Sequence, residues 1–188
     1  MSQRAATLSR ADLATSTIAV VAAALLTAAA AQVNVPYTPV PQTLQTLVVL
    51  AAGCALGAQR GAASQLLYLA MGSAGMPVFA EWKAGVAVLS GPTGGYLFGF
   101  VAAAFLAGWI CDRAGRDFWV TLPAMLVASV PIYVLGLAWL RQEIGVGWAA
   151  AADVGLEPFV IADLLKIFAA AAMLDPRAPW GRLTRRLL

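Results

Sequence analysis

Asp163 and Lys166 are the two residues whose types and spacing most clearly suggest chemistry. They lie three positions apart in the apolar segment 157–174, so in a helix they share one face. An ionisable side chain at membrane depth costs about 2.5–3.5 kcal/mol on insertion scales, and such residues usually face the protein interior and serve a function. Two interpretations remain open. A ligand carboxylate could meet Lys166 while Asp163 accepts from an N–H donor, or an Asp–Lys ion pair could simply hold helices together.

The residues around this pair indicate which side of the helix faces inward. Small or aromatic side chains share the face of the pair, and larger apolar side chains cover the opposite face. The first group is Phe159, Ala162, Ala169 and Ala170, and the second is Ile161, Leu164, Leu165 and Phe168. Small residues beside the charges leave room for a partner molecule.

A glycine-rich segment, Gly91-Pro92-Thr93-Gly94-Gly95-Tyr96, is a second candidate. Glycine permits close backbone approach, and unpaired amides at a helix start favour an anionic or carbonyl group. Tyr96 would add an aromatic wall with a polar end. A tight loop with glycine-mediated helix packing explains the spacing equally well. No Gly-Lys-Ser/Thr follows, so this is not a nucleotide-binding P-loop.

The segment Gln42-Thr43-Leu44-Gln45-Thr46 supplies neutral hydrogen-bonding groups. If a helix begins near Gln42, then Gln42, Gln45 and Thr46 lie on one face. Capping explains some of these groups. Gln45 would lie nearly a full turn inside the helix, where capping does not explain it.

These residues must be positioned by membrane helices. Of the 188 residues, 61% are hydrophobic and 11% are charged, whereas soluble domains carry about 25% charged residues. The composition therefore predicts an all-α integral membrane protein, a single domain with six transmembrane helices. The expected spans are 13–33, 42–59, 61–75, 91–111, 118–140 and 157–174.

The boundaries of the early spans follow from helix-breaking residues. Three prolines in the segment 34–41 force extended or turn geometry, and Arg60-Gly61 is expected to divide the second span from the third. The first apolar run is long for a signal peptide and is interpreted as a retained span. Spans two and three are shorter than the roughly 30 Å hydrocarbon layer, so adjoining loops should dip inward and could form a pocket open to the outside.

Orientation follows from the distribution of Lys and Arg. Six spans place nine basic residues on one side and two on the other, with Lys166 at membrane depth. The nine are Arg4, Arg10, Arg60, Arg113, Arg116, Arg177, Arg182, Arg185 and Arg186, and the two are Lys83 and Arg141. Basic loops face the cytoplasm, so both termini are predicted to be cytoplasmic.

Several classes of site are excluded or disfavoured by composition. The chain has no histidine, which removes His-based metal, haem and Ser-His-Asp sites, and no catalytic residue, metal or cofactor is predicted. Cys54 and Cys111 lie in separate apolar stretches and are expected to be buried, inert thiols. The basic residues are scattered at helix ends, so nucleic-acid binding is not expected.

Four blocks, taken together, resemble the BioY family, the biotin-binding S component of energy-coupling factor (ECF) transporters. They are residues 40–47, residues 67–69 together with 72–80, Gly91 to Phe100, and Asp163-Leu164-Leu165-Lys166. The resemblance implies a six-helix, multi-pass protein of the bacterial cytoplasmic (inner) membrane, surrounded by lipid. Its implied partners are biotin, a transmembrane coupling protein and ABC-type ATPase subunits, with the alanine face of the first span as a candidate docking surface.

Two segments depart from the pattern of that family. Glu81-Trp82-Lys83 stands where the family usually has a glycine-rich stretch, which affects the outer loop. Ile161-Ala162 replaces the usual Pro-Gly before the aspartate, which affects the entry into the last span.

Biotin suits the residues identified above. Its carboxylate could pair with Lys166, its ureido N–H groups could donate to Asp163 or Gln45, and its apolar body fits Tyr96. Residues 34–41 are expected to close over the ligand. The full predicted site is Asp163, Lys166, Tyr96, Gln45, Thr43, Gly91 and Thr93.

Other functions remain open at this point. The protein could take up another vitamin or a small carboxylate. Asp163 and Lys166 could be the acid–base pair of a membrane enzyme, although no nucleophile–base set accompanies them. A membrane scaffold that binds no small molecule is the last alternative.

Overall fold

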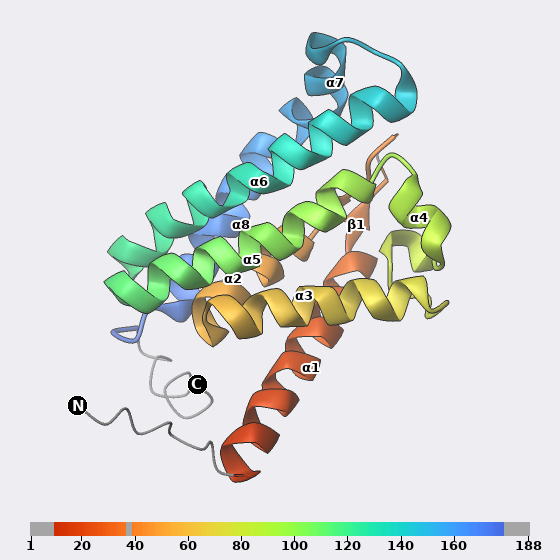
Figure 1. Ribbon diagram of the computed structural model, residues 1–188. Coiled ribbons are helices and arrows are strands. Elements are labelled where there is room, and N and C mark those ends of the chain that lie inside the picture. The colour runs from red at the N-terminus through yellow and green to blue at the C-terminus, as the bar shows by residue number, and fades with distance from the viewer. Residues whose placement is uncertain (1–9, 37–38, 179–188) are drawn as a thin grey trace, which may run out of the picture.

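The computed structural model describes residues 10–36 and 39–178 and is mainly helical (Figure 1). A two-stranded hairpin and a short 3-10 helix, η1, accompany the α-helices. The elements are α1 (Arg10–Gln32), β1 (Asn34–Val35), β2 (Gln42–Thr43), α2 (Gln45–Leu56), α3 (Ala58–Ser73), η1 (Ala80–Trp82), α4 (Val86–Ser90), α5 (Gly94–Ala114), α6 (Phe118–Ile144), α7 (Trp148–Gly155) and α8 (Glu157–Leu174). The short elements η1, α4 and α7 were not predicted from the sequence.

Three helices within the described residues are long and apolar enough to cross a membrane. They are Asp12–Gln32, Gly94–Ala114 and Phe118–Ile144. Two others are shorter than the roughly 30 Å hydrocarbon layer, as expected for the second and third spans, since α2 has 12 residues and α3 has 16, or roughly 18 and 24 Å of helix. The last helix, α8, has 18 residues but carries Glu157, Asp163 and Lys166. The prediction is therefore confirmed at a coarser level, as a mostly helical chain with three candidate membrane spans, and the β1–β2 hairpin departs from the all-α prediction.

The packing is centred on α5. This helix packs most extensively against α6 and also contacts α2 and α3 (Figure 1). Glycines permit the close contact with α6, because an added Cβ at Gly95 would lie 2.3 Å from the Leu135 carbonyl oxygen, and one at Gly99 would lie 2.6 Å from the Ile132 Cα. Both distances are impossible for a real side chain, so these positions require glycine.

The boundary between α2 and α3 differs from the expectation. The chain breaks at Gly57, which has φ +84°, whereas Arg60 and Gly61 lie within α3. A positive φ is readily adopted only by glycine, and this explains why the break occurs there. The Asp112 carboxylate accepts a hydrogen bond from the Ala58 amide at 3.0 Å and so satisfies a free donor at the start of α3.

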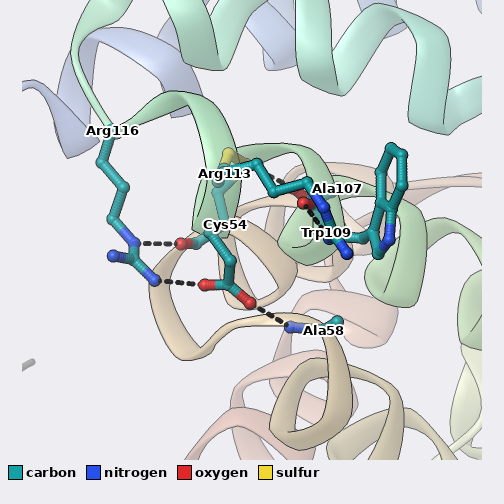
Figure 2. A network of polar contacts seen from close by, with 8 residues as sticks. Cys54, Ala58, Ala107, Trp109, Arg113 and Arg116 are labelled. Carbon is teal, nitrogen blue, oxygen red and sulfur yellow. Dashed lines mark hydrogen bonds and ion pairs between the residues drawn. A yellow bond between two sulfur atoms is a disulfide. The ribbon is translucent and has the colours of Figure 1, made fainter.

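A polar network ties together the ends of α2, α3 and α5 (Figure 2). The Arg116 Nε donates to the Cys54 carbonyl oxygen at 2.6 Å, and its Nη2 pairs with the Asp112 Oδ1 at 2.7 Å. Arg113 stacks over the Trp109 ring, 4.1 Å from its centre. These contacts fix the end of the bundle at which α5 finishes.

Cys54 and Cys111 are joined by a disulfide, and the expectation of two separate thiols is wrong. Both are buried, as expected, but their Cα atoms lie 5.3 Å apart although 57 positions separate them in the chain. The packing of α2 against α5 brings them together. Sequence spacing carried no signal for this tertiary contact.

The second predicted span begins later than expected. Gln42 and Thr43 form β2, which pairs antiparallel with β1 through Asn34–Thr43 and Val35–Gln42, and α2 starts only at Gln45. Pro41 lacks an amide N–H and disfavours a helix in the residue before it, so this stretch is extended. The shared helical face predicted for Gln42, Gln45 and Thr46 is therefore wrong.

The alanine face of α1 is used internally along its second half. Ala24 and Ala31 are fully buried, and α1 contacts α2 and α3. Large apolar side chains such as Leu13 and Ile18 are exposed on the first half. From Ala23 onward the alanine face is therefore an internal packing surface and is not exposed for docking.

Candidate ligand-binding site

A cavity of about 320 Å³ lies at the end of the bundle where α5 begins. The hairpin, η1, α4, α5, α6 and α8 all contribute to its wall. The structure brings all seven predicted site residues to this one cavity, and they are Thr43, Gln45, Gly91, Thr93, Tyr96, Asp163 and Lys166. That they contact a ligand stays a prediction.

Asp163 and Lys166 form a buried ion pair on α8. The Lys166 Nζ lies 2.7 Å from the Asp163 Oδ1, and the two residues are only 9% and 6% exposed. The outward face is as predicted, with Ile161 and Leu165 exposed. Ala169, which was expected on the inner face, is exposed. The departure Ile161-Ala162 lies within α8, which continues through it.

Lys166 also joins α8 to the hairpin. Its Nζ donates to the Thr43 carbonyl oxygen at 2.7 Å. This bond depends on β2 being a strand, because the carbonyl of Thr43 would otherwise be committed to a helix. The sequence pattern missed the contact because it predicted a helix there.

Tyr133 is a candidate site residue that sequence reasoning missed. Its hydroxyl donates to the Asp163 Oδ2 at 2.5 Å, and its side chain lines the cavity from α6. A tyrosine in the middle of the uncharged stretch 118–140 needs a hydrogen-bond partner when it is buried. This requirement is the sequence signal that could have identified Tyr133 as a partner of a buried polar group.

The cluster of Asp163, Lys166 and Tyr133 keeps spare hydrogen-bonding capacity. An ammonium group has three N–H donors, and Lys166 uses two of them, on Asp163 and Thr43. A carboxylate can accept about four hydrogen bonds, and Asp163 accepts from Lys166 and Tyr133. The cluster can therefore offer a charged donor and a charged acceptor, side by side, to one ligand group.

Both polar atoms of the Gln45 side-chain amide form hydrogen bonds. Its Oε1 accepts from the Thr43 hydroxyl at 2.9 Å, and its Nε2 donates to the Tyr68 hydroxyl at 2.8 Å. Tyr68, which the prediction did not include, in turn donates to the Val78 carbonyl oxygen at 3.3 Å. Gln45 is the first residue of α2, so its burial reflects tertiary packing against α3 and not depth within a helix.

The packing interpretation of the glycine-rich segment is confirmed at Gly95, and ligand binding by this segment stays a prediction. Gly91 and Thr93 line the cavity, whereas Gly95 packs against α6. The Gly91 carbonyl accepts from the Trp139 indole N–H at 3.1 Å, which holds the segment against α6. Tyr96 lines the cavity and donates to the Gly155 carbonyl oxygen at 2.8 Å.

Lys83 is a second cation of the cavity wall. It pairs with Glu81 at 2.6 Å, and the two side chains are 59% and 36% exposed respectively. Of the charged residues in the described wall, two are lysines and one is Asp163, which leaves one net positive charge.

The segment 34–41 was expected to cover a ligand. Pro39, Val40 and Pro41 do line the cavity. Tyr37 and Thr38 lie outside the described residues. Closure over a ligand stays a prediction.

Within residues 10–36 and 39–178, no group of three or more His, Cys, Asp or Glu side chains could hold a metal ion.

Sequence comparison connects these features to known proteins. The model of the BioY family matches residues 1–182. A relative named "Probable biotin transporter BioY" from Pyrococcus horikoshii is 40% identical over 141 residues, covering 75% of this chain and 82% of the relative. "Biotin transporter BioY" from Thermotoga maritima is 38% identical over 141 residues, with the same coverage of 75% and 82%.

A solved structure shares the fold. It is described as the S-component for biotin from an ECF-type ABC transporter, with a TM-score of 0.81. The match covers 96% of this chain and 94% of the other, at 20% sequence identity. At this identity the match supports the architecture alone.

Proposed function

The chain belongs to the BioY family, and from this premise we propose that it is the biotin-binding membrane subunit, the S component, of an ECF-type vitamin transporter. The observation that carries the proposal is the cavity wall itself. The seven residues predicted from the sequence to bind a ligand all line one cavity of about 320 Å³. Small-molecule pockets have volumes of roughly 300–1,000 Å³. BioY is a transporter family and not an enzyme family, so the acid–base interpretation of Asp163 and Lys166 is set aside.

The polar cluster on α8 fits the ureido ring of biotin. A cyclic urea presents an N–H donor beside a carbonyl acceptor. Asp163 keeps acceptor capacity and Lys166 keeps one N–H, and the two groups are already 2.7 Å apart. The ureido ring can therefore bind this preformed pair without separating its charges.

The remaining wall suits the apolar part of the ligand. Side chains of Leu97, Phe100, Ile132 and Phe159 line the cavity and are buried. Burial of apolar ligand surface contributes about 25 cal/mol per Å², while a few polar groups set orientation. A mostly apolar wall with a few polar groups is typical of binding sites for small molecules.

We further propose six spans with both termini in the cytoplasm. The described basic residues Arg113 and Arg116 lie at the end of α5, and the cavity lies at its start. The cavity would thus open to the outside, as uptake requires. Four residues of the basic group, Arg4, Arg182, Arg185 and Arg186, lie outside the described residues.

The proposed partners follow from this function. They are a transmembrane coupling protein and ABC-type ATPase subunits, because the sequence has no P-loop of its own. Lipid would contact the exposed apolar side chains of α1 and α6, such as Ile18 and Val127. A multi-pass position in the bacterial cytoplasmic membrane, without nucleic-acid binding, completes the proposal.

Equilibrium binding of radiolabelled biotin to the purified protein tests the function. We expect saturable binding at one site per chain. Mass spectrometry of co-purified ligands is the companion measurement. Another vitamin or small carboxylate in place of biotin, or no ligand in either experiment, would contradict the proposal.

A further inference from the structure

Tyr68 lies directly behind the cavity wall without being part of it. The residue belongs to α3 and is fully buried, whereas its neighbours Gln45 and Phe79 line the cavity. Its ring packs edge-on against the Phe79 ring, with the ring centres 5.5 Å apart. Tyr68 can therefore influence a ligand only through the residues that it holds in the wall.

The Tyr68 hydroxyl group acts toward Gln45 only as an acceptor. A phenol has one proton, and Tyr68 donates it to the Val78 carbonyl oxygen at 3.3 Å. The Gln45 Nε2 donates to the same hydroxyl oxygen at 2.8 Å. If the amide were turned by a half rotation, the Gln45 Oε1 would face an oxygen whose proton is already used. Tyr68 therefore favours one of the two orientations of this amide.

Thr43, the other partner of the Gln45 amide, does not select an orientation. Its hydroxyl group donates to the Gln45 Oε1 at 2.9 Å and accepts from the Gln45 backbone amide at 3.2 Å. Because a hydroxyl group can both donate and accept, it could also accept from the Nε2 of a turned amide. The orientation of the amide therefore depends on Tyr68.

The favoured orientation leaves one N–H of Gln45 available to a ligand. A side-chain amide has two N–H donors, and within the described part of the chain the Gln45 Nε2 uses one of them, on Tyr68. Thr43 contacts Gln45 through its hydroxyl group and Lys166 through its carbonyl oxygen. The spare N–H groups of Gln45 and Lys166 therefore belong to the same part of the cavity wall.

We propose that Tyr68 is a positioning residue of the ligand site, which orients the Gln45 amide so that it offers an N–H donor to a ligand carbonyl. This inference rests on the proposed biotin function, because the ureido carbonyl of biotin is such an acceptor. In the turned orientation, the Gln45 oxygen would face that carbonyl oxygen, and neither acceptor would have a donor. A buried polar group without a partner is costly, so the orientation of this one amide affects both affinity and specificity.

The test is a double-mutant cycle on the purified full-length protein, with equilibrium binding of radiolabelled biotin as the measurement. Tyr68→Phe removes the hydroxyl group and keeps the ring. The Val78 carbonyl oxygen still accepts from the Gln32 Nε2 at 3.4 Å, so this variant should keep its fold. Its biotin affinity should fall by about fivefold, the effect of weakening one neutral hydrogen bond.

The second arm of the cycle removes the amide itself. Gln45→Met keeps the length of the side chain and should lower biotin affinity by about tenfold. Adding Tyr68→Phe to Gln45→Met should cause no further loss, since no amide remains to be oriented. A structural role of the Tyr68 hydroxyl group would instead give the same additional loss in both backgrounds, and that result would overturn the inference.

Gln32→Met is the matched control, because it removes the other side-chain donor to the Val78 carbonyl oxygen. Any loss of affinity that it causes should persist when it is combined with Gln45→Met. An unfolded Tyr68→Phe variant, or unchanged biotin affinity in Gln45→Met, would also contradict the inference. The proposed function fails in a distinct way, namely when the unmodified protein does not bind biotin.

Discussion

The Lys166 Nζ lies 2.7 Å from the carbonyl oxygen of Thr43, which joins the last helix to the hairpin that follows the first. The same ammonium group pairs with Asp163. One side chain therefore connects two parts of the chain that are 123 positions apart and places charge beside the cavity. Changes at this point should affect both folding and ligand binding, and the two effects can be separated.

The first prediction separates the two roles of the ion pair. Asp163→Asn and Lys166→Met should each remain folded with a lower melting temperature and lose about 100-fold or more in biotin affinity, because each leaves a buried polar group without its partner. The double variant should recover much of the melting temperature, since no charge remains, but should not recover binding. Thermal unfolding and equilibrium binding of all three variants check this. Biotin affinity restored in the double variant would show that the pair is purely structural.

The second prediction concerns Tyr133, which donates to the Asp163 carboxylate. Tyr133→Phe removes one charge-assisted hydrogen bond, worth about 1.5–3 kcal/mol, and keeps the ring. Biotin affinity should fall by about tenfold or more while the fold persists. Titration calorimetry measures the affinity. A fall in melting temperature with unchanged affinity would limit Tyr133 to a packing role.

The third prediction uses two glycines of the same segment. Gly95→Ala should lower stability by about 1–3 kcal/mol, because its Cβ would lie 2.3 Å from the Leu135 carbonyl oxygen. Gly91→Ala is the control, because its Cβ would meet its nearest neighbour only at 3.4 Å and its φ is −89°. Thermal unfolding in detergent should show a lower melting temperature for Gly95→Ala only. Equal melting temperatures would mean that α5 and α6 are not closely packed at Gly95.

The fourth prediction concerns orientation in the membrane. A fluorescent protein fused to the C-terminus should fluoresce, and alkaline phosphatase fused there should be inactive, because both report a cytoplasmic location. The pattern should reverse for fusions made after Val146, in the connection between α6 and α7, on the side assigned to Arg141. Active phosphatase at the C-terminus would invalidate the assignment by basic residues.

Several features of the fold could be predicted from residues that act locally. The charged positions Asp163 and Lys166 had to face inward on α8, because a charge facing lipid is costly, and the exposed Ile161 and Leu165 agree with this. The prolines of segment 34–41 exclude a helix, and β1 and β2 flank the loop. These predictions depended only on the preferences of a residue and its near neighbours along the chain.

Other features depended on contacts between distant segments. The break at Gly57 was placed at Arg60-Gly61 in the prediction, because nothing local shows that Asp112 satisfies the free amide of Ala58. Tyr133 was missed because its partner lies 30 positions away. The disulfide between Cys54 and Cys111 was not predicted for the same reason, because the two cysteines are 57 positions apart in the sequence.

The sequence by itself determined that this is an apolar, mostly helical chain with two oppositely charged residues facing inward on one helix, since composition and helical periodicity follow from the solubility of each residue in water or lipid. Tertiary structure alone decided that Lys166 donates a hydrogen bond to the Thr43 carbonyl oxygen and that Tyr133 donates one to Asp163. It also decided that Lys83, from another segment, lines the same cavity. These contacts depend on how the helices pack, and the packing is set by the shapes of many side chains at once. No single stretch of sequence contains that information.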